Sequence, residues 1–355
     1  MRILHLVWAP RLSGAEVLAK DLAIHQRNHG DTVGLTSLLP QQDDFAQLRA
    51  ELETHEIACV FPERMPSNVG KLWHLYKVIR QFKPDVLIAH ATIPAFYARA
   101  LPTRVPVIYV MHSAVNDFER SLFRCVERLL SRRARAVIGV SETSVKEYVA
   151  TIGRHPLMQV IPNGVDTTRF VCTTSAENWS RAPQIVQIGR YNAIKNQLQT
   201  VRAFAEVTKR IADVRLLLIG VIEDSAYFAQ VQDLVRELGL EDRAIVDGPR
   251  SDISRLLSDS SVFAMPSLSE GHSIAFLEAL ATGIPVVAST IEAFAFARDF
   301  PGVQLVDTAD TSAYAQAFLN ALRQPRVERA LKGLTLNDTA EQYLAIARRV
   351  ACAGA

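Results

Sequence analysis

The sequence of 355 residues predicts an α/β protein with two domains, each built on a parallel β-sheet covered by helices on both faces. Three observations predict this class. Short apolar segments of strand length alternate with segments that have the 3.6-residue apolar period of helices. The strand-like segments are continuous apolar runs, which is typical of parallel strands buried on both faces. A polar stretch near the middle interrupts the series, after which the alternation begins again.

The first half opens with strand Ile3–Trp8, and a Ser-Gly turn leads into a helix-like run over Ala15–His29 that ends at Gly30. The run Lys71–Lys83 has apolar residues at helical spacing, and Pro84 stops it because proline cannot continue a helix. Further strands of this half are expected at Thr32–Leu38, Val86–Ala89, Val105–Met111, Ala136–Val140 and Met158–Ile161. This alternation predicts a Rossmann-like first domain.

The polar segment VCTTSAENWSRAP at Val171–Pro183 is interpreted as a linker, so we expect domains over residues 1–172 and 180–336. The elements expected in the second half are strands at Ile185–Ile188, Arg215–Ile219, Ala244–Val246, Ser261–Ala264 and Pro285–Ala288, with helices at Asn196–Arg210 and Phe228–Leu238. Open α/β sheets bind ligands beyond the carboxyl ends of their strands. A cleft between two facing Rossmann-like domains is therefore the expected site.

Composition and charge exclude several classes of function. The formal net charge is only +2, which gives no global basic field and predicts no nucleic-acid partner. The four cysteines are scattered without metal-ligand spacing, no other cluster of ligands is evident, and Asp43-Asp44 is interpreted as part of a solvated loop. No apolar run approaches the ~20 residues that span a bilayer, and the opening run is too short for a signal peptide. We expect a cytoplasmic protein with no metal in its site.

The stretch SEGHSIAFLEALATGIPVV at Ser269–Val287 predicts an anion site. Gly271 lets the loop turn, and Ser273 is a good N-cap for a helix over Ile274–Ala281. The first N–H groups of a helix have no partner within it and carry the positive end of its dipole. Such a helix start is suited to phosphate.

Two glutamates flank this helix start. Glu270 lies in the loop before it, and Glu278 lies more than a turn inside the helix. Because a carboxylate accepts hydrogen bonds from neighbouring hydroxyl groups, the pair fits a nucleotide-sugar with the ribose on one side of the phosphates and the sugar on the other. The alternative is a solvated surface glutamate followed by a core helix whose Glu278 faces water, and spacing alone leaves both open.

A second anion cluster follows the first strand of the second half, in GRYNAIKN at Gly189–Asn196. Arg190 stands at the strand end and Lys195 at the start of the next helix, so both cations could neutralise a diphosphate. In a parallel sheet this loop and the loop with Gly271 lie at the same edge. We therefore expect the cations and the helix N-terminus to converge on one ligand.

Together these segments resemble the family 4 retaining glycosyltransferases of the GT-B fold. The resemblance is carried by the Glu270-x7-Glu278 stretch and by the Arg190–Lys195 loop. Four further segments carry it: LSGAEVLAKDLAIHQRNHGDTV at Leu12–Val33, KPDVLIAH at Lys83–His90, VIYVMHS at Val107–Ser113 and VIPNGVDTTRF at Val160–Phe170. The C-terminal segment LNDTAEQYLAIARR is similar to the last helix of the family, which implies that residues 337–355 cross back to the first domain.

The resemblance implies a role for each of these residues. Arg190 and Lys195 would hold the donor diphosphate, Glu278 the ribose and Glu270 the sugar. Backbone amides would meet the donor at Gly271, His272, Ser273 and Ile274. His112 would face the donor sugar, and Gly14 would let the first loop approach the diphosphate or the acceptor. His5 and His90 are expected to pack within or beside strands.

The sequence departs from the family in two places. His272 stands where the family usually has an aromatic residue. The segment TIEAFAFARDFPGVQLVD has only Gly302, so the resemblance carries no donor contacts over to Thr290–Phe294.

The resemblance implies a metal-independent, retaining hexosyltransferase that moves a sugar from a UDP- or GDP-sugar to a glycan or lipid-linked acceptor, as in lipopolysaccharide or exopolysaccharide assembly. Two alternatives stay open: a nucleotide-sugar epimerase of the same fold, and a non-catalytic scaffold that binds nucleotide-sugars. A dehydrogenase is disfavoured because no G-x-G-x-x-G follows a strand.

A basic helix raises the question of a membrane. Over Phe118–Arg135, four arginines recur at helical spacing: Arg120, Arg124, Arg128 and Arg132. On the neighbouring face lie Phe118, Leu122, Cys125 and Leu129. Either the arginines are a solvated face over a core stripe, or the helix attracts the protein to the anionic inner membrane surface.

Overall fold

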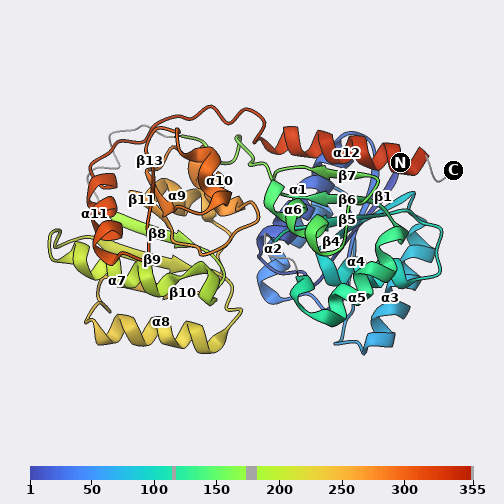
Figure 1. The fold of residues 1–355 in the computed structure, drawn as a ribbon, viewed down its shortest axis with the longest axis horizontal. Coiled ribbons are helices and arrows are strands. Elements are labelled where there is room, and N and C mark those ends of the chain that lie inside the picture. Colours follow the sequence, from blue (N-terminus) through green and yellow to red (C-terminus); the bar gives the residue numbers. More distant parts are fainter. Residues whose placement is uncertain (114–116, 173–181, 353–355) are drawn as a thin grey trace. The chain divides into compact units, whose positions relative to one another are not determined.

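The computed structural model describes residues 1–113, 117–172 and 182–352 (Figure 1). They form two compact units: Met1–Gly164 with Gly333–Ala355, and Val165–Lys332. Most of the segment interpreted as a linker lies outside the described residues. The α/β class is confirmed, because both units are parallel sheets flanked by helices.

The first unit contains a seven-stranded sheet whose middle strand is β4. Its strands are β1 (Arg2–Val7), β2 (Thr32–Ser37), β3 (Ala58–Val60), β4 (Val86–His90), β5 (Val107–Met111), β6 (Ala134–Gly139) and β7 (Met158–Val160). Their order is β3-β2-β1-β4-β5-β6-β7, with every pair parallel. The register places Ile3 of β1 opposite Val33 and Val86. The strand order reverses between β1 and β4, and ligands bind at such a switch point in α/β sheets.

Helices cover both faces of this sheet. They are α1 (Gly14–Asn28), α2 (Ala46–Thr54), α3 (Asn68–Phe82), α4 (Thr92–Ala100), α5 (Ser121–Leu130), α6 (Glu142–Thr151) and α12 (Leu336–Cys352), with short 3₁₀ turns η1 (Asp43–Phe45), η2 (Asp117–Glu119) and η3 (Ser131–Arg133). Consecutive residues of a strand point to opposite faces of the sheet and so pack into different hydrophobic cores. Leu4 and Leu6 share a core with residues of α3 and α4, whereas Val7 shares one with residues of α1 and α2.

The last helix, α12, returns the chain to the first unit and packs against α1, shown in red and blue in Figure 1. The chain leaves the unit at Gly164, where a Cβ atom would lie only 2.1 Å from the carbonyl oxygen of Thr335. Glycine is required there because only a residue without a side chain allows the two backbone segments to approach so closely. The hydroxyl of Thr339 donates to the carbonyl oxygen of Pro162 at 2.9 Å and joins the returning helix to the outgoing segment.

The second unit contains a six-stranded parallel sheet. Its strands are β8 (Gln184–Ile188), β9 (Arg215–Ile219), β10 (Ala244–Asp247), β11 (Val262–Met265), β12 (Val286–Ser289) and β13 (Val303–Val306). Its helices are η5 (Ala193–Lys195), α7 (Gln197–Thr208), α8 (Ser225–Glu237), α9 (Ile253–Asp259), α10 (Ile274–Ala281), η6 (Glu292–Ala297) and α11 (Thr311–Ala321). The order β10-β9-β8-β11-β12-β13 reverses between β8 and β11, which defines the switch point of this unit.

The arginine-rich segment differs from the expected core stripe. Leu122 and Leu129 of α5 are 69% and 78% exposed, and Cys125 between them is also exposed. The core side of α5 carries Glu127 and Leu130 instead. The core-stripe interpretation is therefore wrong for these residues, because α5 is anchored by a buried charge rather than by its most apolar face.

That anchor is an ion pair between Arg99 of α4 and Glu127 of α5, both without solvent exposure. The guanidinium donates to both carboxylate oxygens, at 2.8 and 2.6 Å. The hydroxyl of Tyr148 donates to the same carboxylate at 2.6 Å, and burial, followed by the nearby Glu127 charge, raises the pKa of Tyr148. A bidentate geometry with a third donor is what a fully buried pair needs to offset the loss of hydration.

Candidate active site

Two loops meet at the switch point of the second unit. One follows β8 and contains Gly189–Asn196, and the other follows β11 and leads into α10. The backbone N–H of Leu268 donates to the carbonyl oxygen of Ile194 at 2.8 Å. The side chain of Asn196 donates to the carbonyl oxygen of Pro266 at 3.4 Å. The two loops are therefore in contact, as expected from the prediction that both lie at the same edge of the sheet.

Lys195 and Glu270, from these two loops, form an ion pair. The Lys195 Nζ atom lies 2.5 Å from Glu270 Oε1, and the two side chains are only 13% and 10% exposed. The lysine is held by its backbone, because its N–H donates to Asn192 Oδ1 at 3.0 Å and its carbonyl oxygen accepts from Gln187 Nε2 at 2.7 Å. A largely desolvated cation beside a helix N-terminus is suited to a phosphate ligand.

Arg190 is placed differently, at the start of the same loop. Its guanidinium forms a half-exposed ion pair with Glu223, and Asn192 Nδ2 donates to the second Glu223 oxygen at 2.6 Å. Sequence reasoning missed Glu223. The signal that could have found it is its position a few residues after the neighbouring strand β9, which the strand order brings beside β8.

A close backbone approach shapes this loop. A Cβ atom at Gly220, directly after β9, would lie 1.9 Å from the carbonyl oxygen of Gly189. Only glycine fits there, so the β8 loop rests directly on the end of β9. The buried side chain of Gln197 also donates to the carbonyl oxygen of Arg190, at 3.0 Å.

The helix start at α10 has the predicted bounds and cap. The Ser273 hydroxyl accepts from the N–H of Phe276 at 3.4 Å, and Gly271 is buried in the preceding turn. Ile274 and Glu278 are both partly buried. Glu270, Gly271 and Ser273 thus surround the N-terminal end of α10, whereas Glu278 lies further along it.

Aromatic rings support this helix start. The His272 ring stacks on Phe296 with centroids 5.3 Å apart, and burial lowers the pKa of His272 to about 4, so the ring is neutral at physiological pH. The segment Thr290–Phe294 leads into η6, where Phe294 stacks on Phe276 of α10 at 4.4 Å. At Phe294, the segment therefore packs against the helix that carries the candidate site.

In the first unit, a chain of three histidines extends from the switch point. His5 lies on β1, His90 on the adjacent β4, and His112 directly after β5. His5 Nδ1 lies 3.0 Å from His90 Nε2, and His90 Nδ1 lies 3.1 Å from His112 Nε2. His5 and His90 are buried within strands, as predicted, whereas their connection to His112 was not predicted.

The side chain of Gln26 fixes the direction of this histidine chain. Its Oε1 atom can only accept, so His5 donates through Nε2 at 2.8 Å and accepts at Nδ1. Burial lowers the pKa of His5 and of His112 to about 4 and that of His90 further below its ordinary value, so all three rings are neutral near pH 7. Each neutral ring then donates through Nε2, and His112 presents Nδ1 as a hydrogen-bond acceptor.

The loop between β1 and α1 leads to Gly14, the exposed first residue of α1. Asp44 stabilises this loop, because its carboxylate accepts from the N–H of Leu12 at 3.1 Å. The interpretation of Asp43-Asp44 as a solvated loop is therefore wrong for Asp44, whose partner is 32 residues away in the sequence. Gly14 and His112 both belong to the first unit, and Arg190, Lys195 and the α10 residues belong to the second.

Two Rossmann-like units, the second with a cation and a helix N-terminus at its switch point, define a protein of the GT-B fold. A solved structure of Anabaena HepE in complex with UDP and glucose has this fold, with a TM-score of 0.77 and 21% identity, covering 98% of this chain and 100% of that one. The chain belongs to the family 4 (group 1) glycosyltransferases: residues 12–169 match the model for glycosyltransferase family 4, and residues 182–324 match the model for glycosyl transferases group 1.

Curated relatives of this chain are also glycosyl-transferring enzymes. The N-acetyl-alpha-D-glucosaminyl L-malate synthase of Bacillus anthracis is 22% identical, over 94% of this chain and 91% of the relative. The UDP-Gal:alpha-D-GlcNAc-diphosphoundecaprenol alpha-1,3-galactosyltransferase of Escherichia coli is 24% identical, over 76% of this chain and 73% of the relative.

Proposed function

We propose that this glycosyltransferase is a retaining, metal-independent hexosyltransferase that moves a sugar from a UDP- or GDP-sugar to a lipid-linked or cell-surface glycan precursor. The observation that carries the donor assignment is the Lys195–Glu270 pair beside the N-terminus of α10. It offers positive charge for a diphosphate and a carboxylate for sugar hydroxyls within one small volume. The name of the Escherichia coli relative, which specifies a UDP-sugar and a lipid diphosphate acceptor, supports both substrate classes.

In this proposal each residue has a separate task. Lys195 and Arg190 neutralise the donor diphosphate, and the backbone N–H groups at Gly271–Ile274 donate further hydrogen bonds to it. As charge develops on the leaving diphosphate, these fixed donors stabilise it without reorganising, which is the usual source of a large rate effect. Glu270 binds the sugar and Glu278 the ribose, both by accepting from hydroxyl groups.

His112 contributes as a neutral acceptor. Its Nδ1 atom is suited to accept from a hydroxyl of the donor sugar, because the chain through His90 and His5 keeps the proton on Nε2. The configuration of the sugar is retained when the hydroxyl of the acceptor substrate attacks the anomeric carbon from the same face that the diphosphate leaves. An oxygen of the leaving phosphate then takes the proton of that hydroxyl. No cofactor is required by this scheme, since the charge that a metal would neutralise is met by Lys195, Arg190 and α10.

A thermal-shift panel of UDP-, GDP- and ADP-sugars tests the donor assignment. We expect one nucleotide-sugar to stabilise the protein, by ~2.7 kcal/mol at 100 times its Kd, because it binds only the folded state. Glu278→Ala is expected to abolish this shift, since it removes the proposed ribose contact. Glu237→Ala, on the exposed end of α8, is the matched control and should leave it intact. An unchanged melting temperature with every donor would contradict the assignment.

The two alternatives are separated by product analysis. An epimerase converts the donor sugar without an acceptor, so nucleotide release that requires acceptor excludes it. A non-catalytic scaffold binds the donor and releases neither nucleotide nor sugar. The presence of Arg190, Lys195, Glu270 and Glu278 together favours the enzyme, because a site that does not catalyse has no need of all four.

A surface of the first unit fits the proposed membrane-linked acceptor. On α5, the exposed Leu122 and Leu129 lie with Arg128 on the solvent side of the helix. On α3, Val69 and Trp73 are exposed at one-turn spacing, with Lys77 one turn further on. Exposed apolar residues interspersed with cations are typical of interfacial helices that bind anionic lipid. None of the described helices has a stretch both long and apolar enough to cross a bilayer.

Sedimentation with phosphatidylglycerol vesicles checks this surface. Leu122→Ser with Leu129→Ser is expected to weaken vesicle binding about tenfold or more, since each leucine contributes ~1.5–3 kcal/mol when fully inserted. Both side chains are exposed, so the fold should be unaffected. Leu238→Ser, at an exposed position of the second unit, is the control. Equal binding by the double variant, or binding that is just as strong to phosphatidylcholine, would contradict a role for this surface.

A further inference from the structure

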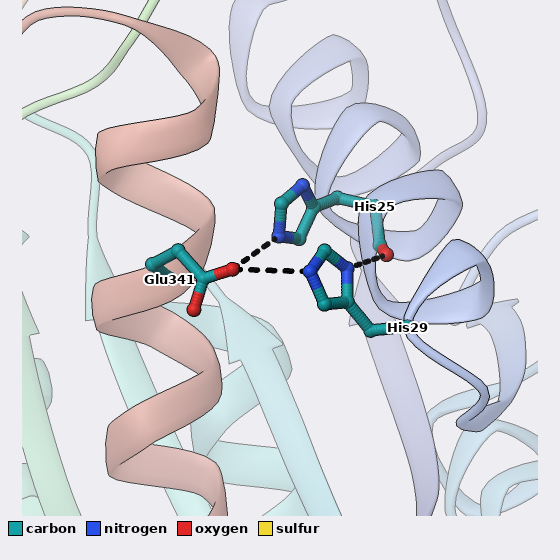
Figure 2. A group of neighbouring side chains, drawn as sticks. All are labelled: His25, His29 and Glu341. Atoms are coloured by element: carbon teal, nitrogen blue, oxygen red, sulfur yellow. Dashed lines mark hydrogen bonds and ion pairs between the residues drawn. The ribbon is translucent and has the colours of Figure 1, made fainter.

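A group of three potential metal ligands lies where α1 meets α12 in the first unit, whereas Lys195, Glu270 and α10 belong to the second. His25 lies in the last turn of α1, His29 is the residue that follows the helix at its C-terminal end, and Glu341 faces them from α12 (Figure 2). The sequence analysis found no cluster of ligands, because Glu341 is 316 residues from His25 along the chain. The only local signal was the histidine pair at i and i+4, which places both rings on one helix face.

Two of the three spacings between these atoms match a tetrahedral metal site. Glu341 Oε1 lies 3.3 Å from His25 Nε2 and 3.1 Å from His29 Nε2, and all three ligand atoms lie within 4.8 Å of one another. Metal bonds of about 2.0–2.1 Å in a tetrahedron separate the ligand atoms by about 3.3 Å. The side chains are 12%, 41% and 49% exposed for His25, His29 and Glu341, so a metal ion can enter and a water molecule can complete its shell.

The hydrogen bonding of His29 requires a cation at its Nε2 atom. His29 Nδ1 lies 2.9 Å from the carbonyl oxygen of His25, and a carbonyl oxygen can only accept, so Nδ1 carries a proton (Figure 2). In the neutral ring Nε2 then holds a lone pair, and Glu341 Oε1 lies 3.1 Å from this nitrogen. Two acceptors at 3.1 Å repel each other unless a proton or a metal ion lies between them.

We propose that His25, His29 and Glu341 bind one divalent transition-metal ion, Zn²⁺ by preference, which joins α12 to α1. Two imidazoles and a carboxylate are ligands that zinc accepts, and the Nδ1–H bond to a backbone carbonyl is the usual device that orients a zinc-binding histidine. Because α12 brings the chain back from the second unit, the ion would fix this return against the first unit. The inference does not depend on the proposed transferase chemistry.

Zinc titration of the full chain tests the proposal. After treatment with EDTA and desalting, Zn²⁺ alone is titrated against a competing chelator, and melting is followed in parallel. We expect one equivalent to bind and the Tm to rise by about 5 °C or more when the ion is in large excess over its Kd. His29→Ala and Glu341→Ala should each lower the zinc affinity about tenfold or more and remove most of the Tm rise.

His55→Ala, another partly exposed histidine of the first unit, is the matched control and should bind zinc as the unchanged protein does. The two positions that are changed, His29 and Glu341, are 41% and 49% exposed, so the Tm of the metal-free variants should stay within about 2 °C of that of the unchanged protein. Absence of a stoichiometric site would overturn the proposal and leave a proton shared between His29 and Glu341. Undiminished affinity in Glu341→Ala would overturn the link to α12, because the helical histidine pair would then bind the ion alone.

Discussion

Lys195→Ala is expected to lower the rate of sugar transfer by about 10²–10³-fold, the effect of removing one fixed donor from a developing oxyanion. The reason is the position of its Nζ atom, nearly desolvated beside the N-terminus of α10 and 2.5 Å from Glu270. A charge in such surroundings acts more strongly than one in water. Steady-state kinetics with the donor identified by thermal shift give the measurement.

The same change should also destabilise the second unit, because Glu270 is left nearly buried without its partner. We expect a loss of about 2–3 kcal/mol, below the 3–5 kcal/mol of a fully buried pair because some exposure remains. The double variant Lys195→Ala/Glu270→Ala separates the two effects: stability should recover and activity should not. Lys209→Ala, which breaks the exposed pair with Glu206, is the control and should change neither. Recovery of activity in the double variant would show that Lys195 serves only as the partner of Glu270.

Glu127→Ala is expected to reduce the free energy of unfolding of the first unit by about 3–5 kcal/mol, the typical effect of leaving a buried charge unpaired. Arg99 would keep its guanidinium at no solvent exposure, with its carboxylate partner gone. Since whole domains are stable by only about 5–15 kcal/mol, this is a large fraction of the total. Urea denaturation can be monitored by hydrogen exchange on peptides from α4 and α5. This readout measures the unfolding free energy of the first unit separately from that of the second.

Two further variants give the comparison. Arg99→Met with Glu127→Leu removes both charges and fills similar volume, so most of the lost stability should return. Arg49→Ala breaks a half-exposed pair with Glu53 on α2 and should cost at most about 1 kcal/mol. A loss below that level in Glu127→Ala would mean that water reaches Arg99, and that α5 is not held by this pair.

Elements with a strong local pattern could be predicted from the sequence. The bounds of β9 and α10 agree with the expected Arg215–Ile219 and Ile274–Ala281, because both are apolar runs bounded by clear turn or capping residues. The strands β3 and β13 were missed. Residues Ala58–Val60 and Val303–Val306 lie on edge strands and are partly exposed, so they lack the continuous apolar signal of the central strands.

The candidate site was predictable in its parts and not in its pairings. Capping rules located the helix start at Ser273, and Arg190 and Lys195 were located at the end of a strand and at the start of the next helix. They could not show that Lys195 pairs with Glu270 whereas Arg190 pairs with Glu223, because those partners are 75 and 33 residues away. The order of strands in the sheet decides which loops are neighbours, and local patterns hold little information about that order.

By itself, the sequence determined the α/β class, the central strands and the anion-binding helix start. These features depend on the spacing of apolar residues and on turn and capping residues, which are all local in the sequence. Only the tertiary structure decided the histidine chain behind His112, the exposed leucines of α5 and the meeting of His25 and His29 with Glu341. Each of these depends on which segments the sheets and the returning helix α12 bring together. Such contacts between distant residues follow from the packing of the whole unit rather than from any local period.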